Sequence, residues 1–392
     1  YSNFVNSGED HTVQATLVAT STRAVAYLDD ATSDTVKITT ADIQGMMDTF
    51  SNVSYPAVTQ TFGEGSDVDS DGKVLFLFTQ LVDAEPFIAG FYRSSSLFTE
   101  AEGGDGNVAD MMFIGLDSSL DFYTTLLAHE FQHLVNYNQH VLVNNGGREE
   151  SWLNEGLSHY AEDLVDGHVD GGMSRLYSRL LEAPEIYSLT GPPKTSSGVR
   201  GAAYLFVRGL VKEFGEGIAT QLVQTSLTGI ANVEQVTGRS FEELVSTHAT
   251  RLFLSGTGLN SGEKYTYSFP FFTEPTTGQR SLPMPFETGF SANGTPVAGQ
   301  VKPVASAYLR MMGEGSNVSV DIETEIAGNF RAILIPIPQN FRPERSLKGD
   351  YFPGVAFNAP IEGQYTSGEA VRVSGSLLDQ SLDRILWRFQ TA

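Results

Sequence analysis

The segment LLAHEFQHLVNYNQH, residues 126–140, places two histidines four positions apart with a glutamate directly after the first. On an α-helix such residues lie one turn apart on the same face, so both imidazoles can reach one metal ion. The HExxH pattern needs this spacing, because His129 and His133 supply two neutral nitrogen ligands while Glu130 lies beside the ion as a general base. The segment therefore predicts a helix over residues 120–140 that carries a zinc site.

A catalytic zinc site needs a third protein ligand and one open position. The extended pattern HExxHxxGxxH does not fit, because Asn136 and Gln139 occupy the positions of its glycine and its last histidine. His140 lies one residue too far along, and we expect it on the solvated surface. The other candidate is Glu155 in ESWLNEGLSHYAEDL, residues 150–164, on a second helix that can return antiparallel to the first.

Glu155, His159 and Glu162 are spaced i, i+4 and i+7, so they share one face of that second helix. If this face meets the first helix, Glu155 completes a set of two histidines and one glutamate. His159 or Glu162 can then orient a ligand imidazole through a hydrogen bond. The alternative is an exposed Glu155 near a helix start, which the helix dipole favours. The nearby HEFQH motif favours the metal ligand.

The composition excludes several classes of partner and site. The chain has 47 acidic and 24 basic residues, a formal net charge of −23, so we expect no nucleic-acid partner and no attraction to an anionic membrane surface. It has no cysteine, which excludes disulfides, thiolate zinc sites and thiol nucleophiles. The longest near-continuous apolar stretch, residues 74–82, has the length of a buried strand, so no membrane span is expected.

Hydrophobic periodicity predicts a mixed α+β order. Residues 14–28 alternate like one or two strands, and residues 39–50 have helical periodicity, with Thr39 and Asp42 as a capping start. The remaining predicted elements fall into two groups, strands followed by helices. The strands are 73–81, 90–95 and 109–116, and the helices are 120–140, 151–165, 172–182, 200–215 and 239–254.

Helical periodicity stops in SGTGLNSGEK, residues 255–264, where glycine, serine and asparagine cluster. The segments 318–326, 331–338 and 370–378 then read as strands. The sequence therefore predicts a domain over residues 1–262, with a sheet and the motif-bearing helix in 1–140 and a helical subdomain in 141–262. Residues 263–392 are predicted to form a β-sandwich domain.

The segment DVDSDGKV, residues 67–74, places three aspartates at alternate positions before a glycine. Carboxylates in this pattern can converge on one calcium ion, and the glycine permits the tight turn. The predicted ligands are Asp67, Asp69, Asp71 and the backbone carbonyl of Lys73. Phe78 stands where a full EF-hand has its glutamate, so Asp83 or Glu64 is the expected closing ligand. The alternative is a solvated acidic turn without an ion.

HExxH followed by WLNEG is the signature of gluzincins, the zinc peptidases with a glutamate as third ligand. WLNEGLSHYAE at 152–162 is similar to the corresponding segment of zinc aminopeptidases. The chain resembles more closely the hyicolysin-like secreted bacterial metallopeptidases, which share the AHEFQH form, a DxDxDGKV segment and a helix similar to residues 201–215. The resemblance covers roughly residues 10–255. It implies a zincin-like catalytic domain with Glu130 as general base and His129, His133 and Glu155 as zinc ligands.

The chain departs from the family patterns in ways that bear on activity. No segment resembles the Gly-Ala-Met-Glu-Asn motif that anchors a substrate N-terminus in aminopeptidases, which favours an endopeptidase. His159 stands where thermolysin-like members have an aspartate. The aminopeptidase tyrosine that stabilises the oxyanion has no counterpart at its usual place. Tyr204 is therefore the first candidate for this role, with His168 and Tyr187 behind it, and packing is its alternative.

The resulting expectation is a secreted bacterial zinc endopeptidase, monomeric, with a peptide or protein substrate, a zinc ion and a calcium ion. A zinc aminopeptidase is the second hypothesis. A third is a calcium-stabilised surface-binding protein without catalytic activity. Glu130 beside both histidines argues against this third hypothesis, because a structural zinc ion needs no general base.

Overall fold

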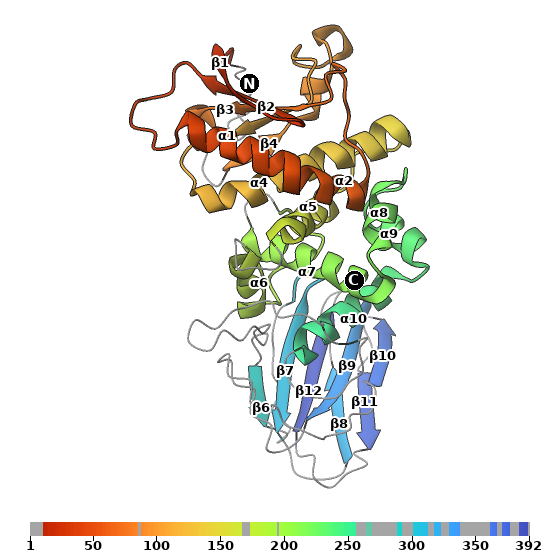
Figure 1. Cartoon of the computed structure of the whole chain (residues 1–392). Helices are drawn as coiled ribbons and strands as arrows, with labels where there is room; N and C mark the ends of the chain where they lie inside the picture. Colours follow the sequence, from red (N-terminus) through yellow and green to blue (C-terminus); the bar gives the residue numbers. More distant parts are fainter. Residues whose placement is uncertain are drawn as a thin grey trace. The chain divides into compact units, whose positions relative to one another are not determined.

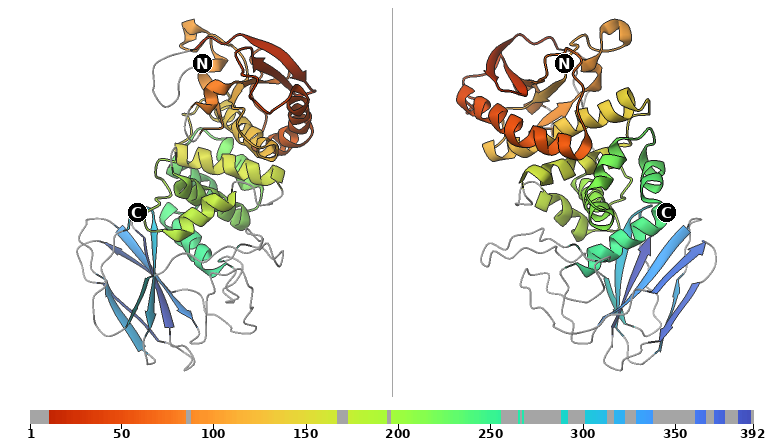
Figure 2. Two further views of the ribbon diagram at one scale, coloured as in Figure 1. Left: turned by 90° about the vertical axis from the view of Figure 1, so that its left-hand side faces the viewer. Right: turned by 45° about the vertical axis from the view of Figure 1, so that its right-hand side comes forward.

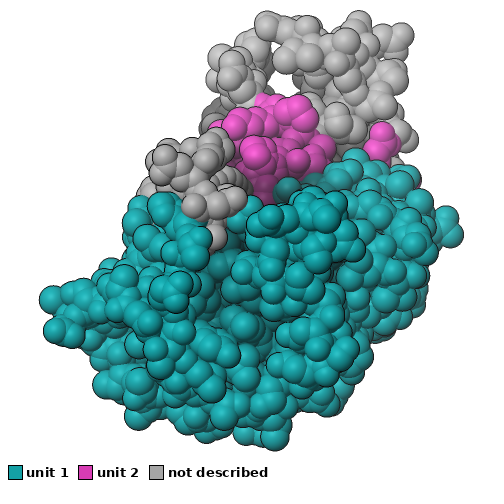
Figure 3. Space-filling view, turned by 90° about the horizontal axis from the view of Figure 1, so that it is seen from above, with its two compact units in different colours: residues 1–172, 214–237 teal, residues 173–213, 238–392 magenta. Residues whose placement is uncertain are grey.

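A computed structural model of the chain describes most of residues 11–255 and separate segments beyond them. The described residues are 11–84, 88–166, 173–193, 196–255, 265, 267, 288–291, 301–312, 317–322, 329–337, 361–366, 371–376 and 384–390. The chain divides into two compact units, shown in different colours in Figure 3. Unit 1 comprises residues 1–172 and 214–237, and unit 2 comprises residues 173–213 and 238–392.

A five-stranded mixed sheet lies in unit 1 (Figure 1). Its order is β1-β2-β3-β5-β4; β2, β3 and β5 run parallel, whereas β1 and β4 are antiparallel edge strands. All of the strands predicted between residues 14 and 116 are present. Their bounds are Ala15–Thr20 for β1, Ala24–Asp29 for β2, Val74–Phe78 for β3, Gly90–Tyr92 for β4 and Met111–Ile114 for β5.

The central strand β3 has the sequence VLFLF, and four of its five residues are buried. A parallel strand covered on both faces needs such a continuous apolar run, whereas β1 at the edge exposes half of its residues. Helix α1 (Thr40–Thr49) packs against β1 and β2 (Figure 2). The predicted capping start is confirmed, because Thr39 and Asp42 form a reciprocal capping box.

The motif-bearing helix α4 (Leu120–Tyr137) packs against strand β4 and against helices α2 (Tyr55–Phe62) and α5 (Ser151–Asp166). Phe131 of α4 is fully buried, with ring centroids 5.2 Å from Phe50 and 5.1 Å from Tyr55. These rings hold α4 under the sheet, so its polar residues face α5. In the described part of the chain, no helix is long and apolar enough to cross a membrane.

Short helical segments complete unit 1. A π-helical turn, η1 (Phe50–Ser54), joins α1 to α2, and a second, η4 (Asn138–Val143), continues α4. The others are α3 (Gln80–Asp83), η2 (Ser94–Leu97), η3 (Glu100–Glu102), α8 (Gly217–Val223) and α9 (Gly229–Thr237).

Unit 2 contains three helices and two sheets among its described residues. The strand order is β10-β9-β12-β7-β6 in the larger sheet, and β8 pairs with β11 in the smaller one. The Tyr308 hydroxyl in β7 donates to the Ala249 carbonyl in α10 at 2.7 Å. The helices are α6 (Met173–Glu182), α7 (Ser197–Phe214) and α10 (Phe241–Leu254). The strands are β6 (Thr288–Ser291), β7 (Ser306–Met312), β8 (Asn317–Ile322), β9 (Asn329–Ile337), β10 (Ile361–Thr366), β11 (Val371–Ser376) and β12 (Arg384–Gln390).

The α+β class is therefore confirmed. The predicted strands near 318–326, 331–338 and 370–378 correspond to β8, β9 and β11. That these sheets form a β-sandwich stays a prediction. So does the boundary near residue 262, which lies outside the described residues.

Candidate metal centre

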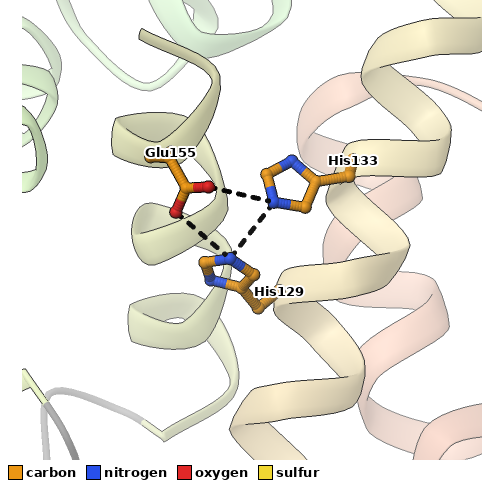
Figure 4. A group of neighbouring side chains, drawn as sticks. All are labelled: His129, His133 and Glu155. Atoms are coloured by element: carbon orange, nitrogen blue, oxygen red, sulfur yellow. Dashed lines mark hydrogen bonds and ion pairs between the residues drawn. The ribbon is translucent and has the colours of Figure 1, made fainter. Parts of the chain in front are cut away.

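Three side chains from α4 and α5 converge on one point (Figure 4). His129 Nε2 lies 3.2 Å from His133 Nε2 and 3.6 Å from one carboxylate oxygen of Glu155, and His133 Nε2 lies 3.8 Å from the other. Ligand atoms held about 2.0–2.2 Å from a tetrahedral zinc ion are about 3.3–3.6 Å from each other. The donor atoms and their separations therefore fit one zinc ion.

The local sequence explains why these donors meet. The i, i+4 spacing puts both histidines on the face of α4 that meets α5, and Glu155 lies in the second turn of α5. The Glu155 side chain is 17% exposed and that of His129 is 7% exposed, so solvent reaches the point of convergence only narrowly. The structure brings together the three residues that the sequence singled out. Their role as zinc ligands stays a prediction.

Glu162 holds two histidines through one oxygen atom. Its Oε1 lies 2.7 Å from His129 Nδ1 and 2.6 Å from His159 Nδ1. A carboxylate only accepts, so each Nδ1 donates, and the lone pair of His129 Nε2 is directed to the point of convergence. Although burial raises the pKa of Glu162, the two histidines lower it to about 2. The predicted orienting role of Glu162 is thus matched by a direct contact with His129.

His159 lies beside His129, with one ring nitrogen toward Glu162 and the other toward Glu155. Its ring centroid is 4.7 Å from that of His129, and its Nε2 lies 3.9 Å from Glu155 Oε2. Burial lowers the pKa of His129, but Glu155 and Glu162 raise it to about 10. The buried carboxylates therefore favour a positive charge at His129, which is a proton on Nε2 in the metal-free site and would be a metal cation in place of that proton.

Sequence reasoning missed the partner of the other histidine. The Ser158 hydroxyl lies 3.0 Å from His133 Nδ1, 3.5 Å from His133 Nε2 and 2.5 Å from Gln132 Oε1, and both Ser158 and Gln132 are fully buried. Ser158 follows Glu155 by three residues and so shares its helical face. The spacing in sequence indicated that Ser158 faces the same way as Glu155. Serine is nevertheless common in helices, so its role could not be predicted without knowing which residues of α4 lie opposite it.

Glu130 lies in α4 beside the first histidine and is 5% exposed. One of its carboxylate oxygens accepts a hydrogen bond from the backbone amide of Tyr92, in edge strand β4, at 2.9 Å. Its charge is also near enough to raise the pKa of His129. The carboxylate is therefore anchored at the sheet edge, one residue after His129, and its role as general base stays a prediction.

The expected solvated position of His140 is wrong. This residue is fully buried, and its Nε2 lies 3.4 Å from a carboxylate oxygen of Glu149. It belongs to the π-helical turn η4, and burial lowers its pKa. Glu149 also binds the Gly229 amide, so the surface covering this region comes from residues about 80 positions further along the chain. Sequence periodicity cannot predict burial by residues so distant in the chain.

Tyr204 is a buried residue of α7, in unit 2, and its oxyanion role stays a prediction. Tyr187 also belongs to unit 2, and His168 lies outside the described residues.

The aspartate-rich loop differs in part from the predicted calcium site. Asp67 and Asp69 form a group with the buried Asp110, which precedes β5, whereas the Asp71 carboxylate accepts from the Lys73 amide at 2.7 Å. Gly72 has a φ of 71°, as the predicted tight turn requires.

The two expected closing ligands bind elsewhere in the described structure. Asp83 accepts from the backbone amides of Leu116 and Asp117, and Glu64 accepts from the Tyr55 hydroxyl. Calcium binding by the loop stays a prediction.

Comparison with known proteins finds a similar curated protein and similar solved structures. No protein-family model matches the chain. The neutral metalloprotease ShpI of Staphylococcus hyicus is 30% identical over 141 residues, covering 32% of this chain and 32% of that protein. This chain therefore spans about a third of the length of the relative.

Among solved structures, an M1 zinc metallopeptidase from Deinococcus radiodurans has a TM-score of 0.36 and 13% identity, over 60% of this chain and 50% of that chain. A two-domain M1 zinc metallopeptidase bound to L-arginine has a TM-score of 0.32 and 14% identity, over 57% and 43%. The sequence match to ShpI confirms the resemblance to bacterial metalloproteases that the two motifs predicted.

Proposed function

We propose that this chain is a secreted zinc-dependent endopeptidase. The observation that carries the proposal is the convergence of His129, His133 and Glu155 at separations that fit one zinc ion, with Glu130 anchored beside them. Three protein ligands leave the fourth position of a tetrahedral ion open, which is the arrangement of catalytic zinc sites. The similarity to a neutral metalloprotease supports the same activity.

A zinc ion held by these three side chains would polarise a water molecule and the carbonyl group of a bound peptide. The Glu130 carboxylate would accept a proton from the attacking water and then deliver it to the nitrogen of the leaving amine. The hydrogen bond from the Tyr92 amide to Glu130 Oε2 would restrain the carboxylate while it exchanges the proton. Glu162 keeps His129 in the tautomer that a metal ligand needs.

The decisive experiment substitutes the proposed general base. Glu130→Gln should keep the zinc content of the wild type and lower the rate of casein hydrolysis by about 10²- to 10⁴-fold, because the amide cannot accept the proton. Glu216→Gln is the matched control, since this exposed glutamate lies at the start of α8. Undiminished hydrolysis by the Glu130 variant would refute the proposal.

Endopeptidase and aminopeptidase activities are separated by the substrate. An endopeptidase cleaves an internal bond of a peptide whose N-terminus is blocked, whereas an aminopeptidase needs the free amine and cleaves amino-acid anilides. We expect cleavage of the blocked peptide, because the sequence has no aminopeptidase anchor motif. Loss of this cleavage with o-phenanthroline would tie it to the metal. A protein that binds zinc but cleaves neither substrate would instead support the inactive surface-binding alternative.

A further inference from the structure

One carboxylate oxygen of Glu162 is held from both helices of the candidate metal centre. His129 Nδ1, in α4, lies 2.7 Å from Glu162 Oε1, and His159 Nδ1, in α5, lies 2.6 Å from the same atom. The two imidazole rings are inclined to each other by 61°. A carboxylate oxygen has two lone pairs, and here each accepts one imidazole proton. The position of this oxygen is therefore fixed on two sides.

The contact within α5 follows from the segment HYAE, residues 159–162. Residues three positions apart are neighbours on a helix surface, so the side chains of His159 and Glu162 meet on the face that packs against α4. Both residues are buried, with exposed fractions of 4% and 6%. Water therefore competes little for their hydrogen bond, and a buried carboxylate needs donors of this kind.

A hydrogen bond from His129 alone would hold Glu162 less firmly. A glutamate side chain has several rotatable bonds, and their freedom must be lost before the carboxylate can orient another group. The hydrogen bond from His159 restricts these bonds from within the same helix. His129 then meets a carboxylate that is already in place, which is how an outer hydrogen-bond partner fixes the orientation of a ligand imidazole.

We infer that His159 is a positioning residue that fixes Glu162 for the proposed zinc ligand His129. The inference rests on the proposed function. Spacing in the sequence leaves open whether His159 or Glu162 orients a ligand imidazole; the geometry gives the direct contact to Glu162 and the supporting contact to His159. The other ring nitrogen of His159 lies 3.9 Å from Glu155 Oε2, beyond hydrogen-bond reach, so His159 acts through Glu162.

Two substitutions separate hydrogen bonding from packing, because the two roles predict opposite results. His159→Phe keeps a buried ring and removes the donor, whereas His159→Asn loses the ring and carries an amide N–H near the place of Nδ1. Zinc affinity, measured in the full chain by competition with a chelator, should fall about tenfold or more in His159→Phe and stay within about threefold of the wild type in His159→Asn. His248→Phe in α10 is the matched control, with an exposed fraction of 5%, and should bind zinc like the wild type.

A double-mutant cycle tests whether His159 acts through Glu162. Glu162→Leu removes the oxygen that both histidines contact. In this background His159→Phe should change zinc affinity by less than about twofold, because the group through which it acts is already absent. A packing role would give the same loss of zinc affinity in both backgrounds.

Wild-type zinc affinity in His159→Phe would overturn the inference, as would an equal loss in His159→Asn or an equal effect of His159→Phe in the Glu162→Leu background. If His159→Phe does not fold, His159→Asn decides alone, since a tenfold loss of zinc affinity in it would contradict the role of the donor. These results, with zinc binding and casein hydrolysis intact in the wild type, would leave the proposed function standing. A wild-type chain that binds no zinc would refute both.

Discussion

Glu149 is a buried carboxyl group whose protonation we expect to change the stability of unit 1. One of its oxygens accepts from the backbone amides of Glu150 and Gly229, both at 2.6 Å. The other accepts from Asn232 Nδ2 at 2.8 Å and lies 3.4 Å from His140 Nε2. Burial raises the pKa of Glu149 from 4.5 to about 7; these hydrogen bonds lower it, and the nearby charge of Glu150 raises it further.

The direction of this pKa shift determines whether stability rises or falls with pH. A carboxyl group with a raised pKa in the folded state stabilises the protein fully below pH 4.5, and this contribution is lost as the pH rises through about 7. A shift of about 2.5 units corresponds to about 3 kcal/mol at most, and the loss between pH 5 and pH 8 is roughly 2–3 kcal/mol. His140 acts in the opposite sense, because its pKa is lowered and its contribution is lost as the pH falls.

We propose to test this with Glu149→Gln, which removes the titratable carboxyl group and keeps the size of the side chain. Urea unfolding of the metal-free protein at pH 5 and pH 8 would give the free energy of unfolding of each variant. In a Trp387→Phe background, Trp152 is the only tryptophan and reports on unit 1. Subtracting the change in the variant from that in the wild type cancels the groups that titrate alike in both proteins, and the difference reports on Glu149 together with its coupling to His140.

We expect the wild type to lose roughly 2–3 kcal/mol more than Glu149→Gln between pH 5 and pH 8. Parallel pH profiles would show that Glu149 titrates near its ordinary pKa. The reasoning that burial outweighs its three hydrogen bonds would then be wrong. A wild type that gains stability relative to the variant would refute the sign as well.

Three further predictions address other parts of unit 1. Glu162→Gln should weaken zinc binding about tenfold or more in chelator competition, because a neutral amide holds His129 less firmly. Unchanged zinc affinity would show that the contact between Glu162 and His129 does not contribute to zinc binding. Phe131→Ala should lower the free energy of unfolding by about 3–5 kcal/mol in urea titrations, since its ring is fully buried, and a loss below 1 kcal/mol would show that the site collapses around the cavity. Calcium should raise the unfolding temperature of the wild type but not of Asp69→Asn in thermal scans, and equal responses would exclude the aspartate loop as the binding site.

Local periodicity was sufficient to predict the longer helices and the convergence of the three donors, whereas the shorter helices α2, α8 and α9 were not predicted. The spacing of His129 and His133 defines one face of α4, and Glu155 with Glu162 defines one face of α5. A short connection between two helices leaves few ways to bring two polar faces together other than antiparallel packing. These features depend on contacts within one helix or between helices adjacent in sequence.

The residues that sequence reasoning missed depend on longer-range contacts. His140 contacts the backbone of Leu222 and Thr225, more than 80 residues further along, and Asp110 approaches Asp69 from a different strand end. No periodicity within one element contains this information. The π-helical turn η4 adds to the difficulty, because an extra residue in a turn rotates every later side chain relative to the α-helical pattern.

Ser158 lies between these two cases, because one part of its role could be predicted from the sequence and the other could not. It shares the helical face of Glu155 and Glu162, so its orientation toward α4 could be predicted, but its function depends on the residue it meets there. Only the register of α5 against α4 places its hydroxyl between Gln132 and His133 rather than beside an apolar side chain. The spacing of residues in the sequence thus predicts which side chains are candidate ligands. The hydrogen bonds that orient these ligands can be identified only once the packing of α5 against α4 is known.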